Sequence, residues 1–343
     1  MNVNRVEKPI TVWLYFIGFL VLCMVLIGGI TRLTDSGLSM VDWKPIMGAI
    51  PPLTESDWLI LFKKYKSFPE YQLINAGMSL SDFKSIFFWE YFHRLFGRII
   101  GLAFLLPYLY FIYTKKISKS LNIKLLISFV LGGLQGLMGW YMVKSGLVNE
   151  PDVSHYRLAA HLSLAFIIIG YLYWITLGIK YSEYERKKSI FENKIIFIFG
   201  LVLIVQIVFG ALVAGLDAGL THNTFPKMGR VWIPQTVYEF ISLDIYLHNQ
   251  VVVQFIHRCL AWSLLLLGFI IFIKRKVSCS FNQQKSKIII FAVLLIQFIL
   301  GVLTILMLVP ITIASLHQIF ACILLLAFIR LVFFSTHQVS VAP

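Results

Sequence analysis

Four histidines lie inside long apolar runs of the sequence, where an ionisable side chain is costly and usually marks a functional site. They are His93, His161, His257 and His317. Each is followed four residues later by a small residue, which lies on the same helix face one turn away. These small residues are Gly97, Ala165, Ala261 and Ala321. The spacing predicts that each imidazole faces a bulky, flat group such as haem, whose iron is commonly bound by histidine.

The histidines form two pairs, one in each half of the chain. The pairs are His93 with His161 and His257 with His317. Two imidazoles that face each other inside a helix bundle can hold a haem iron, whereas zinc or copper without a porphyrin would require three or four converging ligands. Two haem sites therefore fit better than bare metal sites. A plainer interpretation stays open, in which His93 bonds a neighbouring helix and Gly97 and Gly101 form a close-packing seam.

One carboxylate accompanies the first histidine pair. Glu90 lies three residues before His93, which places both on one helix face. The equivalent residue before His257 is the neutral Gln254. An acid beside only one pair predicts proton chemistry in the first half and electron transfer in the second. The alternative is that Glu90 makes a structural bond to a nearby arginine.

Three arginines near the same ends of the spans are candidates to bind the propionate groups of haem. They are Arg32, Arg94 and Arg258. Guanidinium groups pair well with carboxylates. The alternative is that these long side chains extend to the lipid headgroups.

The composition predicts a protein of the lipid membrane. The sequence is 59% hydrophobic and only 13% charged, whereas soluble domains have roughly a quarter of their residues charged. The formal net charge is +14, but the basic residues cluster in short loops between apolar runs, as is typical of membrane topology. No polar segment is large enough to form a nucleic-acid surface, so we expect no nucleic-acid partner.

Eight apolar runs are long enough to span a membrane as helices, which takes about 20 residues each. The expected spans are Val12–Ile30, Phe87–Tyr113, Ile123–Val143, Tyr156–Ile179, Ile195–Gly215, Asn249–Ile273, Ile288–Leu308 and Ile311–Phe334. Basic residues at the N-terminus and in the second, fourth and sixth connections fall on one side, the cytoplasmic side by the positive-inside rule. Both termini are then expected in the cytoplasm. The long first connection, residues 31–86, is expected outside as a cap of short helices.

The two halves repeat each other. Residues 28–38 and 210–220, at the ends of the first and fifth spans, match at Gly, Asp, Gly and Leu without a gap. Further aligned pairs are His93-Arg94 with His257-Arg258, and Leu131-Gly132 with Leu300-Gly301. Four spans per half make the repeat parallel. We therefore expect an all-α polytopic membrane protein of two pseudo-symmetric four-helix bundles, residues 1–180 and residues 181–343.

Two long motifs resemble the haem A synthase family, in its proteobacterial and mitochondrial branch. They are GGITRLTDSGLSM at residues 28–40, followed by Trp43 and Pro51-Pro52, and EYFHRLFGR at residues 90–98. The resemblance covers essentially the whole chain, including both repeats and all four histidines. The lack of a transit peptide favours a bacterial origin, and the resemblance implies a multi-pass protein of the inner (plasma) membrane.

The resemblance implies an enzyme that oxidises the C8 methyl group of haem O to the formyl group of haem A, through successive hydroxylations and loss of water. Haem A then serves cytochrome oxidase assembly. By the family pattern, His257 and His317 are axial ligands of a permanent haem B, and His93 and His161 hold the substrate haem beside Glu90. The implied partners are membrane lipid, the enzyme that produces haem O and an electron acceptor that the sequence does not identify. The sequence leaves the oligomeric state open, a homo-oligomer included.

One feature departs from the family pattern. Some members carry a cysteine pair in the first outer loop, but residues 31–86 contain no cysteine, so a thiol-dependent step is not expected here. Two other functions remain open. A di-haem B electron-transfer subunit linked to quinone would use the same histidine pairs without needing Glu90. A transporter of two parallel repeats would require broken helices near the midplane, where this sequence has continuous apolar runs.

Overall fold

A computed structural model describes residues 3–40, 48, 50–146, 151–239, 242–274 and 280–339 of the chain. Trp43, which follows the first sequence motif, lies outside the described residues.

The described residues contain eight helices that are long and apolar enough to cross a membrane, which confirms the eight predicted spans. They are α1 (Val3–Leu33), α4 (Leu80–Tyr113), α5 (Lys119–Gly146), α6 (His155–Lys180), α7 (Lys194–Gly215), α9 (Gln250–Ile273), α10 (Phe281–Leu306) and α11 (Ile311–Thr336). Helices with apolar side chains on all faces are typical of segments surrounded by lipid and by other helices. The chain is therefore an all-α, multi-pass membrane protein.

Shorter elements connect these helices. They are α2 (Glu55–Tyr65), α3 (Pro69–Leu73), α8 (Leu243–His248), three 3-10 turns at Ile190–Glu192, Ala218–Leu220 and Gln235–Val237, and the strands β1 (Tyr184–Arg186) and β2 (His337–Val339). The two strands pair antiparallel, with Tyr184 opposite Val339. Short helices α2 and α3 are present in the connection 31–86, as the sequence predicted.

Helix α4 begins at Leu80, seven residues before the predicted start of its span. Ser79 and Asp82 form a capping box that satisfies the first backbone N–H groups of the helix. Phe83 on this added segment and Phe87 at the predicted start pack against Phe62 and Tyr65 of α2 in an aromatic cluster. His93 therefore lies in the fourth turn of α4.

The hairpin between α10 and α11 is longer than predicted. Helix α10 ends at Leu306 instead of Leu308. Leu308 and Val309 both adopt positive φ angles, 61° and 57°, and the N–H of Val309 donates to the carbonyl of Thr304 at 2.8 Å. This bond closes the helix in the manner of a Schellman motif, which uses left-handed residues.

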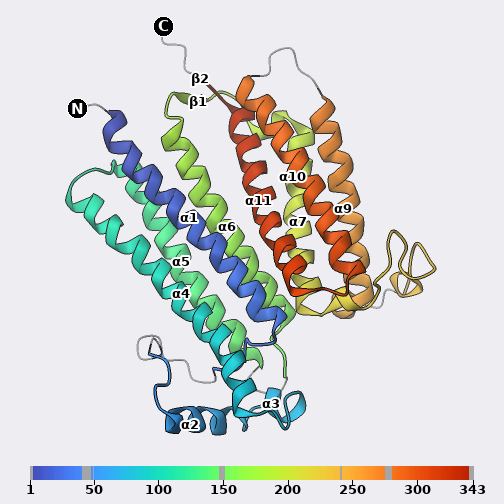
Figure 1. Ribbon diagram of the computed structural model, residues 1–343. Coiled ribbons are helices and arrows are strands. Elements are labelled where there is room, and N and C mark those ends of the chain that lie inside the picture. Colours follow the sequence, from blue (N-terminus) through green and yellow to red (C-terminus); the bar gives the residue numbers. More distant parts are fainter. Residues whose placement is uncertain are drawn as a thin grey trace. The chain divides into compact units, whose positions relative to one another are not determined.

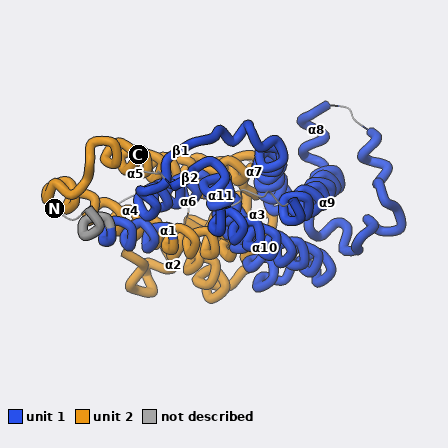
Figure 2. Tube along the Cα trace, turned by 90° about the horizontal axis from the view of Figure 1, so that it is seen from above, with its two compact units in different colours: residues 1–18, 166–343 blue, residues 19–165 orange. Residues whose placement is uncertain are grey.

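The chain divides into two compact units, coloured separately in Figure 2. Unit 2 comprises residues 19–165, and unit 1 comprises residues 1–18 and 166–343. Within unit 1, helices α7, α9, α10 and α11 lie alongside one another (Figure 1) and share one apolar core. Phe199, Leu264, Ile290 and Leu331 contribute to this core from the four helices, one each. Within unit 2, α4 packs against α2 and α5.

The predicted repeat extends to the backbone conformation of the turns that follow α1 and α7. Asp35 has a φ angle of 46° and its counterpart Asp217 one of 50°. Aspartate tolerates this left-handed region better than most residues because its short polar side chain bonds locally. The two halves thus end their first helices with the same unusual turn.

Candidate functional site

Each of the four histidines lies against a glycine on a neighbouring helix. The pairs are His93 with Gly28, His161 with Gly139, His257 with Gly210 and His317 with Gly301. A Cβ atom added to these glycines would lie 3.2, 3.1, 3.1 and 2.9 Å, respectively, from the imidazole. These distances are shorter than most Cβ contacts, so the absence of a side chain at each glycine makes room for the imidazole. The structure therefore places the four predicted histidines in one recurring helix–helix contact.

This contact corrects the alignment of the third and seventh spans. The sequence alignment matched Gly132 with Gly301, but a Cβ atom on Gly132 would meet no other atom within 4 Å. Gly139, seven residues further on, is the residue that contacts an imidazole as Gly301 does. Seven residues make almost two helical turns, so both glycines lie on nearly the same face. Periodicity alone could not choose between them.

Replacing Gly301 with alanine tests this contact. The added methyl would crowd the His317 ring at 2.9 Å, so we expect a loss of about 1–3 kcal/mol of stability, as is usual for overpacking. Thermal unfolding of the detergent-purified protein measures it. Gly132→Ala is the matched control and should leave the unfolding temperature unchanged or slightly higher. Equal losses in both variants would contradict the corrected alignment.

Three glutamines accompany the histidines, and the sequence analysis did not identify them. Gln135 Nε2 lies 3.3 Å from both ring nitrogens of His161 and donates to its carbonyl at 3.1 Å. The other two contacts join Gln206 Nε2 to His257 Nε2 at 3.3 Å and Gln297 Nε2 to His317 Nε2 at 3.4 Å. Each glutamine precedes its contact glycine by four residues. The pattern Gln-x-x-x-Gly inside an apolar run was the signal that could have revealed them.

The geometry of the second histidine pair fits a bis-imidazole haem. The ring centroids of His257 and His317 are 6.5 Å apart, with an interplanar angle of 81°. Metal–imidazole bonds are about 2 Å long, so two such bonds with two half-rings span about 6 Å. The Nδ1 atoms of both rings are buried without a hydrogen-bond partner among the described residues. In the same part of the chain, no group of three or more His, Cys, Asp or Glu side chains could hold a bare metal ion.

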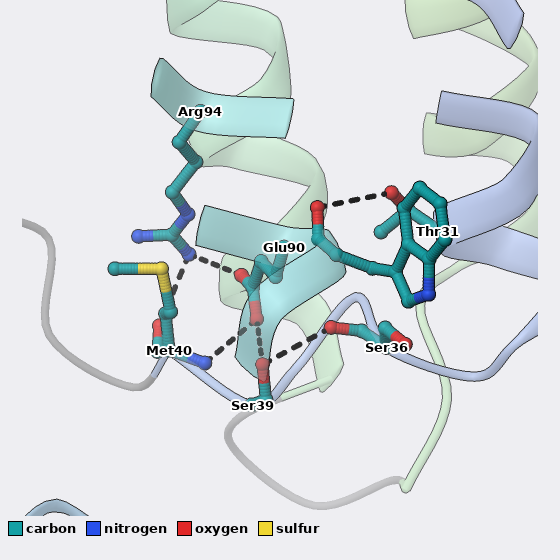
Figure 3. A network of polar contacts seen from close by, with 7 residues as sticks. Thr31, Ser36, Ser39, Met40, Glu90 and Arg94 are labelled. Carbon is teal, nitrogen blue, oxygen red and sulfur yellow. Dashed lines mark hydrogen bonds and ion pairs between the residues drawn. The ribbon is translucent and has the colours of Figure 1, made fainter. Parts of the chain in front are cut away.

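Glu90 lies at the centre of a polar network in unit 2 (Figure 3). Glu90 is only 2% exposed. Its Oε2 atom accepts hydrogen bonds from Ser39 Oγ at 2.7 Å and from the Met40 N–H at 2.6 Å. Its Oε1 atom accepts from Arg94 Nη2, which also donates to the Met40 carbonyl at 3.0 Å. The bond between Glu90 and an arginine, which the sequence analysis gave as the alternative to proton chemistry, is therefore present. The network also holds residues 39–40 against α4.

The second half contains the counterpart of this network, with an amide in place of the carboxylate. Arg258 Nη2 donates to the His222 carbonyl at 2.6 Å and to Gln254 Oε1 at 3.4 Å. Its Nη1 atom donates to the Thr224 carbonyl at 2.8 Å. His222 stands at the repeat position of Met40, so the two arginines make equivalent contacts. Glu90 is thus an acid at a position where the other half has the uncharged Gln254.

Arg32 is the third predicted arginine. Its Nη1 atom pairs with Asp35 Oδ1 at 2.7 Å in the turn after α1. The repeat position in the second half is Ala214, so this ion pair belongs to the first half only.

A second buried carboxylate in unit 2 was missed by the sequence analysis. Glu70 of α3 is only 5% exposed, and its Oε2 atom has no hydrogen-bond partner among the residues that the structure describes. Burial raises the pKa of Glu70 to about 8, and the negative charges of Glu90, Asp35 and Asp152 add to the rise, while a hydrogen bond with Tyr65 opposes it. Nothing in the local sequence distinguishes Glu70 from the exposed acids of the same loop.

Glu70 makes the stability of the loop depend on pH. The folded state holds a proton up to about pH 8 that an unfolded chain releases near 4.5, so stability falls as pH rises between these values. Glu70→Gln should remove this fall and slow amide hydrogen exchange in α2 and α3 at pH 8 and above. The exposed Glu55→Gln is the control. An unchanged pH dependence in Glu70→Gln would contradict the assignment.

Comparison with known proteins yields one family and many close relatives. Residues 11–329 match the family model described as cytochrome oxidase assembly protein. A Nitrosospira multiformis protein named "Heme A synthase" is 44% identical over 331 residues, covering 94% of this chain and 92% of its own length. Proteins of the same name from Wolbachia of Brugia malayi and from Flavobacterium psychrophilum are 45% and 44% identical. They cover 94% and 93% of this chain, and 95% and 96% of their own lengths.

Proposed function

The chain belongs to the cytochrome oxidase assembly protein family, and on this premise we propose that it is an enzyme that oxidises haem O to haem A. The reaction converts the C8 methyl group of haem O to a formyl group for cytochrome oxidase. Relatives more than 40% identical over nine-tenths of the chain carry the corresponding name. The observation that carries the proposal is the recurrence of one imidazole–glycine contact in both halves, with an acid beside only one pair.

The two halves would have different roles. Residues 181–343 would hold a permanent haem B between His257 and His317, whose ring separation of 6.5 Å suits two metal bonds. Residues 1–180 would hold the substrate haem between His93 and His161. Haem B supplies one-electron transfer when bound, and the neutral Gln254 suits a site without proton exchange. The substrate haem is assigned to the first half because Glu90 lies there, beside His93.

Glu90 would serve the chemistry of the substrate site. Oxidation of a methyl group releases protons, and a carboxylate one turn from a substrate ligand is well placed to accept them. Donors from Ser39, Met40 and Arg94 hold the carboxylate in one position, so its geometry needs no rearrangement when the substrate enters. Glu90 is therefore the proposed proton acceptor.

The arginines would bind the polar edges of the haems. Arg94 and Arg258 each directly follow a proposed ligand in the sequence. Each donates a hydrogen bond to a backbone carbonyl of the preceding loop. A propionate there would meet a guanidinium already held in place. Arg32 would add a third charge in the first half.

The membrane setting follows from the spans and the charges. We infer a bacterial inner membrane, with both termini in the cytoplasm and residues 31–86 on the outer side. Lipid surrounds the helices, and haem O would arrive from the enzyme that makes it. Electrons would leave to an acceptor. Crosslinking in native membranes tests the chain for self-association.

Identification of the bound pigments tests the proposed function. The purified protein should yield haem B together with haem O, haem A or a hydroxylated intermediate on chromatography and mass analysis. Two equivalents of haem B, with no modified haem even when haem O is supplied, would overturn it in favour of a di-haem electron carrier.

A further inference from the structure

The residue one turn before the contact glycine is a glutamine for three of the four histidines and a methionine for the fourth. Gln135, Gln206 and Gln297 occupy this position opposite His161, His257 and His317. The corresponding residue opposite His93 is Met24, four residues before Gly28. Its methyl carbon lies 3.4 Å from where a Cβ of Gly97 would stand. Met24 thus lies against α4 one turn from His93, in place of a carboxamide.

The three carboxamides have unused hydrogen-bonding capacity. The Oε1 atoms of Gln135, Gln206 and Gln297 are buried without a partner among the described residues, as are the Nδ1 atoms of His257 and His317. An amide can exchange the places of its oxygen and nitrogen by a half-turn. After such a half-turn, Gln206 and Gln297 would each present an oxygen acceptor to the Nε2 atom that they contact, and the buried Nδ1 atom of the same ring would be the nitrogen left for the iron.

An acceptor beside the imidazole matters when the ring binds a metal. A ligating histidine normally donates its other ring N–H to an acceptor, which fixes the ring and makes the bound nitrogen more basic. A carboxamide oxygen is a good acceptor, whereas the thioether of methionine is a weak one. The four histidines are therefore unequal as ligands, although their glycine contacts are alike.

We propose that Gln206 and Gln297 are positioning residues that make His257 and His317 firm haem ligands, and that Met24 leaves His93 as a weakly held, exchangeable ligand. Gln135 supports His161 in the same way. The inference rests on the proposed function, because a resident cofactor requires two firm ligands while a substrate that enters and a product that leaves require one that releases.

Reciprocal substitutions test the inequality in the full-length, haem-loaded protein. Gln206→Leu removes the acceptor with little change in volume. A less basic ligand favours ferrous iron, so the midpoint potential of the haem between His257 and His317 should rise. Haem transfer to a scavenging protein should become roughly 10–100-fold faster, the usual effect of losing such a partner. Gln206→Glu keeps an acceptor and should retain the low potential.

Met24→Gln provides the opposite change at His93. It should slow the transfer of haem O or haem A from the protein to the scavenger by a similar roughly 10–100-fold factor, and leave the other haem potential unaltered. Met24→Leu is the matched control and should release haem at the original rate. If Gln206→Leu does not fold, Gln297→Leu takes its place.

Two results would overturn the proposal. One is an unchanged potential and transfer rate in Gln206→Leu or Gln297→Leu. The other is equal release from Met24→Gln and Met24→Leu. Either would reduce the glutamines to packing residues. A different experiment detects failure of the proposed function. Pigment analysis would then find only haem B, whereas the potentials and transfer rates could still be measured.

Discussion

His257→Ala should abolish binding of the permanent haem. The imidazole is one of two rings that lie 6.5 Å apart in unit 1, and a methyl group cannot replace it as a ligand. The loss should exceed the roughly 10–100-fold cost of removing a mere supporting partner. The absorption spectrum of the purified protein and its haem B content per chain measure it.

The control for this variant is another histidine of the same unit. His248 of α8 is about half exposed and bonds the backbone carbonyl of Asp244 at 2.8 Å. His248→Ala should therefore keep the spectrum and the haem B content. His317→Ala should behave as His257→Ala does. An unaltered spectrum in His257→Ala would exclude this residue as a ligand.

Glu90→Gln should retain haem B and lose product. The amide keeps the shape of the side chain, and Gln254 shows that glutamine accommodates an arginine four residues later. Loss of a general base typically costs roughly 100-fold or more in rate. The haem A to haem O ratio in membranes that express the variant measures the effect.

Two controls separate a chemical role for Glu90 from a structural one. Ser39→Ala removes one donor to Oε2 but keeps the carboxylate, so it should reduce the rate far less. Gln254→Glu introduces an acid at the equivalent position of the second half and should not create product formation there. Full activity in Glu90→Gln would show that the carboxylate only holds residues 39–40 against α4 and has no role in the reaction.

The membrane spans were predictable because hydropathy is a property of contiguous residues. A helix in lipid satisfies its own backbone groups, so a long apolar run specifies a span without knowledge of its neighbours. The ends were less predictable. The start of α4 depends on aromatic packing of Phe83 and Phe87 against α2, which no local pattern reveals.

The sequence by itself determined the eight spans, the four histidines, the internal repeat and the family. These features follow from residue type and spacing along one chain segment at a time. Only the tertiary structure decided that Gly139 pairs with His161, that three glutamines lie beside imidazoles, and that Glu90 meets Ser39 and Met40. Each of these contacts joins different helices or residues about 50 positions apart. Such contacts arise from packing between segments, which helical periodicity cannot distinguish when two candidate residues share one face.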